Sequence, residues 1–398
     1  MKNTLYVLLL LSLLLSACAP GGALQPSPTA SLPPGASLPT GEAALQPSPG
    51  VAASPTHSAL TKSPTRTPLP PTSTSAPTTA APTLPASLQA TSPASSTATG
   101  QPPILVDHTS VELFDQIPEE FLQAARALRM MYADASVGNN ISETLDCLAA
   151  SGWAESLPYC RMDYIPGLTA VKTYTRADFS SGNVPANILF TPSAERYDRS
   201  NWTFVGKTNE WSHYTQDFIE NIAPGYLDEK DVLSYQFNYQ HVAGTQPIAN
   251  PETGFFSDNP DRYDVHDLEA FIAQHPDKTF FFWTTSLARS IGTQEAADFN
   301  TQMREYAIEH DKILFDVADI ESHTPAGEPC YDNRDGVEYC DMHGNCENFP
   351  DDGLDLPAIC QAYTSELEGG HLGATAAGGL RLAKAMWVLM AQIAGWRP

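Results

Sequence analysis

The sequence contains no hydrophobic run long enough to form a transmembrane helix. Its first apolar stretch, Leu5 to Leu15, has only eleven residues, whereas a helix that crosses a bilayer needs roughly 20. The last helical pattern, at 380–394, is interrupted by Arg381 and Lys384. We therefore expect no membrane-spanning helix in this chain.

Basic residues are also scarce. The chain has 21 lysine and arginine residues against 46 aspartate and glutamate residues, a formal net charge of −25. The only charged side chains among the first 103 residues are Lys2, Lys62, Arg66 and Glu42. The remaining 295 residues therefore carry 18 basic and 45 acidic residues, a net charge of −27. A surface this acidic repels nucleic acid and anionic lipid, which argues against both as partners.

Residues 19–103 lack aromatic side chains and almost all charge, and consist mainly of Pro, Ser, Thr, Ala and Gly. The string Ala-Leu-Gln-Pro-Ser-Pro occurs in them twice, at 23–28 and at 44–49. Such a segment cannot bury enough apolar surface to offset the entropy lost on ordering. We expect it to be a disordered, proline-stiffened stalk that holds the following domain away from the membrane.

The first residues have the pattern of an export signal. A single positive residue, Lys2, precedes the apolar run, and small residues precede Cys18. The sequence Leu-Ser-Ala-Cys18 resembles a bacterial lipobox, in which the cysteine is lipidated and becomes the mature amino terminus. We therefore expect a signal peptide over 1–17, a stalk over 18–103 and a lipid anchor on Cys18 that holds the protein to the outer face of a bacterial cell membrane. Plain secretion, with Cys18 incidental, is the alternative.

The remaining chain, 104–398, alternates between two patterns. Stretches rich in large apolar and β-branched residues, typical of strands, occur at 128–133, 186–190, 231–237, 279–283 and 313–317, and helical patterns occur at 139–150, 263–274, 294–310 and 373–395. This alternation predicts an α/β fold with a mostly parallel sheet of about five strands, flanked by helices. In such sheets the site lies beyond the carboxyl ends of the strands. The Gly-, Asp- and Cys-rich segment 318–370 is expected to be an insertion that forms a lid or a wall of the site.

Six cysteines in an exported domain favour up to three disulfides. Cys147–Cys160 is one candidate pair, although six cysteines allow 15 pairings. Zinc is the rival interpretation within 330–360, where Cys340 and Cys346 flank His343. The cysteine spacing there matches no common zinc pattern, so we expect disulfides and no bound metal or cofactor.

Three residues have the chemistry of a hydrolytic triad. Ser136 follows the first predicted strand and precedes a helix, which places its hydroxyl at the carboxyl edge of the sheet, although capping the helix is the commoner use of such a serine. His371, in Glu368-Gly-Gly-His371 before the last helix, can act as a general base, and Glu368 can hold the other ring nitrogen. Asp319, after the fifth predicted strand, is a second candidate for this acid.

These stretches resemble the SGNH, or GDSL-type, hydrolase superfamily. Ala-Ser136-Val-Gly138-Asn139 is similar to the divergent branch in which His-x-Ser-x-Gly replaces Gly-Asp-Ser, and Gly-Gly-His371-Leu is similar to the last block of the family. The resemblance covers about 127–395. It implies a flavodoxin-like three-layer α/β/α sandwich that hydrolyses carboxylic esters, with Ser136 as nucleophile, His371 as base and Glu368 as acid.

The resemblance also implies two donors for an oxyanion hole. Gly182, in Ser181-Gly182-Asn183, is a loose match to the glycine that the family has after its second strand. Asn238, in Gln236-Phe237-Asn238-Tyr239, stands where the family has Gly-x-Asn-Asp, but without the flanking glycine and aspartate. A turn asparagine that ends a strand is the alternative interpretation of Asn238.

We therefore expect a monomeric cell-surface serine esterase that binds an ester substrate, one candidate being an acetylated polysaccharide, and meets the membrane only through Cys18. A non-catalytic surface module that binds glycan or peptide is the main alternative. A calcium-dependent adhesion or structural protein is a third, prompted by the acidic residues of the insertion, whose spacing matches no EF-hand: Asp332, Asp335, Asp341, Asp351 and Asp352.

Overall fold

The computed structural model describes residues 103–398, apart from 154, 166–169, 245–246, 289–291, 333–337, 341–345, 349, 352, 367–368 and 374–375. The predicted export signal, Cys18 and the stalk up to residue 102 lie outside the described residues, as does His343. None of the helices within the described part is long and apolar enough to cross a membrane.

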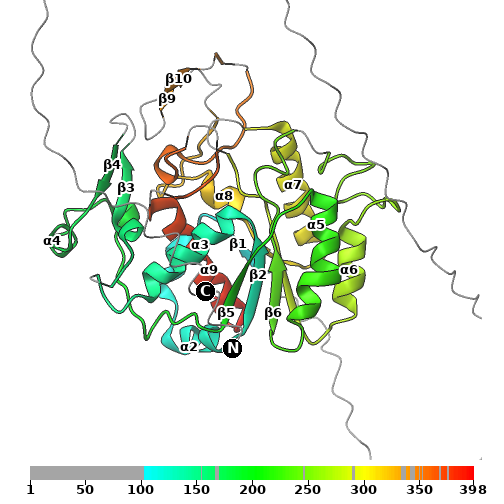
Figure 1. Cartoon of the computed structure of the whole chain (residues 1–398), viewed down its shortest axis with the longest axis horizontal. Coiled ribbons are helices and arrows are strands. Elements are labelled where there is room, and N and C mark those ends of the chain that lie inside the picture. The colour runs from blue at the N-terminus through cyan, green and yellow to red at the C-terminus, as the bar shows by residue number, and fades with distance from the viewer. Residues whose placement is uncertain are drawn as a thin grey trace, which may run out of the picture. The chain divides into compact units, whose positions relative to one another are not determined.

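A six-stranded parallel sheet forms the centre of the fold, in the order β1-β8-β7-β6-β2-β5 (Figure 1). Its strands are β1 (Leu105–Val106), β2 (Met130–Asp134), β5 (Trp202–Gly206), β6 (Val232–Tyr235), β7 (Thr279–Trp283) and β8 (Ile313–Phe315). The predicted α/β fold class is confirmed, with six strands in place of about five. All five residues of β2 are buried, as expected for a parallel strand covered on both faces.

Helices cover both faces of this sheet and complete a three-layer sandwich (Figure 1). On one face lie α2 (Glu119–Ala127), α3 (Ser136–Ala149) and α9 (Ala376–Ile393), and on the other α5 (Trp211–Asp217), α6 (Val265–Ala273) and α7 (Gln294–Glu309). Shorter elements lie between them: α4 (Arg176–Ser180), α8 (Val317–Glu321) and two hairpins, β3 (Met162–Ile165) with β4 (Ala170–Thr173) and β9 (Glu338–Cys340) with β10 (Cys346–Asn348).

The strand order places a topological switch point next to β2. Apart from the edge strand β1, the sheet strands numbered along the chain follow the order 2-1-3-4-5, which is the flavodoxin-like order. β2 pairs with β5 on one side and with β6 on the other, so Met130 lies between Trp202 and Val232. The loops that follow β2, β5 and β6 therefore leave the same edge of the sheet side by side, where such folds bind their ligands.

The second predicted strand, 186–190, is wrong. Ala186–Ile188 forms a short 3-10 helix, and the strand that pairs with β2 on the side away from β6 is β5, further along the chain. Ile188 and Phe190 are buried, so their apolar character serves the core without a strand. Pro185 and Pro192 flank the segment, and proline cannot donate a ladder hydrogen bond.

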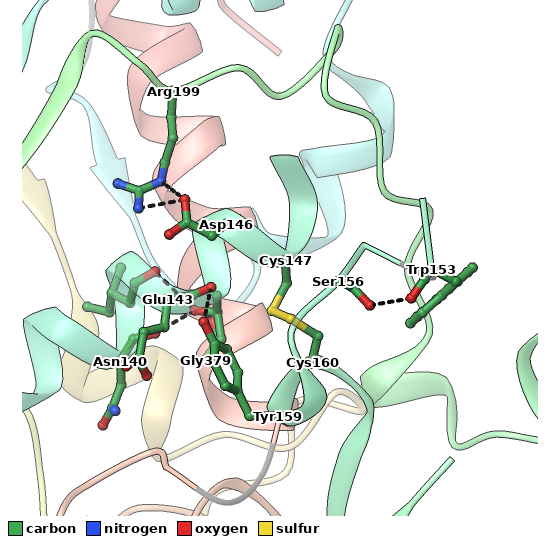
Figure 2. Close-up of a disulfide and its surroundings, with 12 residues drawn as sticks. Asn140, Glu143, Asp146, Cys147, Trp153, Ser156, Tyr159, Cys160, Arg199 and Gly379 are labelled. Carbon is green, nitrogen blue, oxygen red and sulfur yellow. Dashed lines mark hydrogen bonds and ion pairs between the residues drawn. A yellow bond between two sulfur atoms is a disulfide. The ribbon is translucent and has the colours of Figure 1, made fainter. Parts of the chain in front are cut away.

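Disulfides brace α3 and the insertion. Cys147 of α3 is bonded to Cys160, the pair named as a candidate (Figure 2), and the nearby Tyr159 hydroxyl donates to the Glu143 carbonyl of α3. A second disulfide joins Cys330 and Cys360, and Cys346 is also disulfide-bonded. These cysteines are therefore not zinc ligands, and α3, which begins at Ser136, is tied to the segment that follows it.

Candidate active site

Ser136 is the first residue of α3 and its side chain is exposed. It does not cap the helix. That task falls to Asp134, the last residue of β2, whose Oδ2 atom accepts from the Gly138 amide at 2.6 Å. A Cβ atom on residue 138 would lie 2.6 Å from the Asp134 side chain and 2.7 Å from the Phe204 ring, so only glycine permits this close turn. The Ser136 hydroxyl is left to face outward from the end of β2.

His371 connects Ser136 to a carboxylate. Its Nε2 atom lies 2.7 Å from Ser136 Oγ, and its Nδ1 atom lies 2.6 Å from Glu366 Oε1. With the proton on Nδ1, His371 donates to Glu366 and its Nε2 atom accepts from the serine hydroxyl. The hydrogen bond with Glu366 raises the pKa of His371 above its usual value, against the opposing effect of partial burial. The structure thus brings together the two residues that the sequence analysis proposed as nucleophile and base.

Several contacts hold the His371 loop against α3. The His371 amide donates to Glu366 Oε2 at 3.1 Å, and the Thr364 hydroxyl donates to the His371 carbonyl at 2.6 Å. The next amide, that of Leu372, donates to Asn140 Oδ1 at 2.9 Å and so links the loop to the first turns of α3. Together these contacts hold the His371 imidazole beside Ser136, although the two residues are far apart in the sequence.

The acid beside His371 is one that the sequence analysis did not name. Glu368 lies outside the described residues, and Glu366, two positions earlier in the same loop, occupies the Nδ1 side of the ring. The second candidate, Asp319, is wrong: its Oδ2 atom contacts His108 Nδ1 at 2.5 Å and the His108 amide at 2.9 Å. An acidic residue five positions before a histidine in a glycine-rich loop was the signal that could have pointed to Glu366.

Asn238 lies where the loops after β6 and β5 meet. Its Nδ2 atom is 3.3 Å from Thr208 Oγ1, and its Oδ1 atom accepts from the Gln240 amide at 2.9 Å, which fixes the orientation of the side-chain amide. Because β2 lies between β5 and β6, this contact bridges the end of β2, where Ser136 follows. Asn238 is 2 % exposed, so its side-chain amide is held in one orientation at this edge.

The prediction for Gly182 is not supported by the structure. Gly182 follows α4 and does not follow a sheet strand, and its amide donates to the Phe179 carbonyl at 3.1 Å. In the main sheet, the strand that follows β2 along the chain is β5, and it ends in a glycine, Gly206, which pairs with Asp134. Gly182 also precedes the segment 186–190 that was predicted as the second strand, so its match to the family pattern lacked a strand before it.

A cavity of about 270 Å³ lies next to the histidine. Tyr239 lines it and also packs edge-on against the His371 ring, with 5.7 Å between the ring centroids. The other lining residues are mostly small and apolar: Val242, Ala243, Leu287, Ala288, Gly292, Ala296 and Pro357, with Gln240 and Thr293. The cavity can therefore hold an apolar group.

Two buried carboxylates lie behind the serine. Burial raises the pKa of Asp134 to about 7, although the Ala135 and Gly138 amides oppose this. Burial also raises the pKa of Glu321 well above its usual value, and the charge of Asp134 adds to the effect. Glu321 Oε2 accepts from the Leu287 amide at 2.7 Å, beside the cavity. Within the described residues, Asp134 Oδ1 and Glu321 Oε1 have no hydrogen-bond partner, so little offsets the cost of burying either charge.

No family model, no curated protein and no solved structure matches this chain. What the site can do follows from its three polar side chains. A serine hydroxyl, an imidazole positioned to take its proton, and a carboxylate on the other ring nitrogen form the arrangement used for nucleophilic acyl transfer. Such chemistry can proceed with the residues of the chain alone.

Proposed function

We propose that the protein is a serine hydrolase that cleaves carboxylic esters, with Ser136 as nucleophile, His371 as general base and Glu366 as the residue that orients the imidazole. One observation carries the proposal: the continuous chain from Ser136 Oγ to His371 Nε2 at 2.7 Å and from His371 Nδ1 to Glu366 Oε1 at 2.6 Å. It forms at the switch point of a flavodoxin-like sheet, where ligands bind.

The reaction would proceed in two half-reactions. Ser136 Oγ attacks the ester carbonyl while His371 Nε2 takes the hydroxyl proton, which gives a tetrahedral intermediate. His371 then returns that proton to the departing alcohol, and the acyl group remains as an ester on Ser136. Water, deprotonated by His371, attacks this ester, and His371 returns the proton to Ser136 Oγ as the acyl–oxygen bond breaks and the carboxylic acid leaves. Glu366 keeps the proton on Nδ1 throughout and stabilises the imidazolium that forms twice.

The oxyanion of the tetrahedral intermediate needs fixed donors. The amide of Ser136 lies at the N-terminus of α3, where backbone N–H groups and the helix dipole favour negative charge. The side-chain amide of Asn238 is the second proposed donor, because its contact with Thr208 places it across the end of β2. Donors of this kind stabilise the transition state because they need no reorganisation during the reaction.

The apolar cavity supports an ester with an acyl chain of several carbons. Its lining offers few polar partners for a sugar ring, and its position beside His371 suits the acyl side of the substrate. Burial of each methylene contributes about 0.8 kcal/mol, so chains longer than acetyl should react faster until the cavity is full. An acetylated carbohydrate, whose sugar would then lie outside this cavity, is the alternative substrate.

The proposal agrees with the resemblance to the SGNH superfamily. The serine follows the first main strand, the histidine precedes the last helix, and the sheet has the flavodoxin-like order. Membership of this superfamily, and attachment through Cys18 to the outer face of a bacterial membrane, belong to the same proposal.

The first experiment measures ester hydrolysis and active-site labelling together. The full-length protein, Ser136→Ala and the exposed control Ser200→Ala are assayed with p-nitrophenyl butanoate and with a fluorophosphonate probe. We expect wild type and Ser200→Ala to hydrolyse the ester and to label, and Ser136→Ala to do neither. A folded wild type that neither labels nor hydrolyses a series of esters would contradict the proposal and favour a glycan- or peptide-binding module.

A further inference from the structure

A second cluster of polar side chains lies apart from the proposed triad. His108 follows β1 by two residues, Asp319 lies in α8, and His323 follows α8 by two residues. One ligand atom of each side chain lies within 4.8 Å of those of the other two. The three side chains are 22 %, 20 % and 22 % exposed, so an ion from solvent can reach them although the surroundings are partly desolvated.

The cluster is held by the scaffold on both sides. Asp319 Oδ2 contacts the amide and Nδ1 of His108, and the two imidazole rings stack with 4.0 Å between their centroids. The carbonyl of His323 accepts from the Tyr363 hydroxyl at 2.8 Å. Just beyond it, the Cys330 amide donates to the Ser322 carbonyl, and Cys330 is tied to Cys360 by a disulfide. The ligand atoms are therefore brought together by folding.

The residue types select a class of ion. Imidazole suits Zn²⁺ and other divalent transition metals, whereas Ca²⁺ and Mg²⁺ prefer sites made of oxygen ligands alone. His323 Nδ1 lies 2.8 Å from the Asp319 carbonyl and 3.4 Å from Asp319 Oδ1, so the ring is fixed beside the carboxylate that would share the ion. The net charge of −25 also raises the local concentration of divalent cations.

We propose that His108, Asp319 and His323 form a binding site for one divalent transition-metal ion of the Zn²⁺ class, with water completing the coordination. The consequence is structural. β1 is a strand of two residues at the edge of the sheet, paired only with β8 among the described strands. An ion shared between His108 and the α8 segment would hold this short strand, and the chain that leads into it, against the domain.

The same fold supplies a matched control. Asp258, Asp264 and His266 also bring three ligand atoms within 4.8 Å. Asp264, however, caps α6 through the His266 and Asp267 amides and accepts from the Asn259 amide, and the other two residues are exposed. Loss of His266 should therefore leave transition-metal binding unchanged, although it removes a histidine beside two carboxylates from the same acidic surface.

The test is a metal titration of the full-length protein without a histidine tag, after removal of metal with a chelator. Zn²⁺ binding is followed by calorimetry and Co²⁺ binding by visible d–d absorption, for wild type, His108→Ala/His323→Ala, the conservative His108→Gln/His323→Gln and His266→Ala. We expect one ion bound by wild type and His266→Ala, at least tenfold weaker binding in both double variants, and a rise of several degrees in Tm with Zn²⁺ only where the site is intact.

Three outcomes would overturn the proposal. Wild type could bind no Zn²⁺ at micromolar concentrations, which would leave the cluster as a hydrogen-bonded pair of stacked histidines. The folded glutamine variant could bind Zn²⁺ as tightly as wild type, which would place the ion elsewhere. Finally, Ca²⁺ in modest excess could displace Co²⁺, which would show that oxygen ligands alone select the ion. Circular dichroism of each variant separates loss of the site from loss of the fold.

Discussion

The Nδ1 atom of His371 lies 2.6 Å from Glu366 Oε1, and the His371 amide donates to the other oxygen of the same carboxylate. One side chain thus fixes both the ring and the backbone of the residue proposed as base. Glu368, which is closer to His371 in the sequence, lies outside the described residues.

Replacement of Glu366 should impair catalysis far more than replacement of Glu368. Glu366→Gln keeps the size of the side chain but loses the negative charge that stabilises the imidazolium. We expect kcat/KM for p-nitrophenyl butanoate to fall by about 10²- to 10⁴-fold, and Glu368→Gln to remain within about threefold of wild type. Equal losses in the two variants would mean that the carboxylates share the role.

The pH dependence of the reaction should report the same contact. The hydrogen bond with Glu366 raises the pKa of His371, and the base must be neutral, so activity should rise with pH through an inflection above the usual histidine value of about 6.5. In Glu366→Gln the raising contact is lost, and partial burial favours the neutral ring. The inflection in kcat/KM should therefore move to lower pH; an unchanged inflection would assign it to another group.

Asn238 should contribute mainly to the transition state. Asn238→Ala removes the proposed oxyanion donor, and we expect kcat to fall by about 10²- to 10³-fold with a small change in KM. Because the side chain is buried, Asn238→Asp serves as a second variant that keeps the acceptor for the Gln240 amide and loses the donor. Gly182→Ala should leave kcat unchanged. A large effect at Gly182 with none at Asn238 would reverse the assignment of the donors.

The cavity beside Tyr239 should set the preferred acyl length. For wild type we expect kcat/KM to rise on the order of tenfold from p-nitrophenyl acetate to butanoate, since two more methylenes are buried. Ala288→Phe, which fills the cavity, should remove this preference and spare the acetate ester, whereas the exposed Ala186→Phe should retain it. A flat chain-length profile in wild type would favour acetyl esters and place the selectivity in the alcohol.

Asp134 should make the domain less stable as pH rises. Its pKa is raised from 3.8 to about 7 in the folded state, so between about pH 4 and 7 the folded state binds more protons than the unfolded chain, and the free energy of unfolding falls. Asp134→Asn removes this loss while its side-chain oxygen can still accept from the Gly138 amide. We expect the variant to be more stable than wild type at pH 8, by at most about 4 kcal/mol.

Urea unfolding of wild type and Asp134→Asn at pH 4.5 and pH 8 checks this expectation. The difference in the free energy of unfolding should grow with pH. Glu321→Gln, measured in parallel, tests the second buried carboxyl, whose pKa is raised in the same direction. A difference that is the same at both pH values would mean that Asp134 keeps the same charge in the folded and unfolded states.

The amino-acid sequence by itself determined the fold class, the Cys147–Cys160 disulfide as a candidate, and the two residues that meet at the site. Ser136 and His371 could be identified because each stands at a junction with a local signature: a buried strand that turns sharply into a helix, and a glycine-flanked histidine before an amphipathic helix. Signatures of this kind depend on neighbours in the chain, which local reasoning can read.

Only the tertiary structure decided which acid contacts His371, which strand pairs with β2, and where Asp319 lies. Glu366 contacts His371 Nδ1, and sequence spacing alone could not single it out from other acids near the histidine. β5 and the segment 186–190 are both apolar, but only β5 forms a hydrogen-bonded ladder with β2. Asp319 instead contacts His108, 211 residues away. In the last two cases the deciding contact joins segments far apart in the chain, so no local pattern contains it.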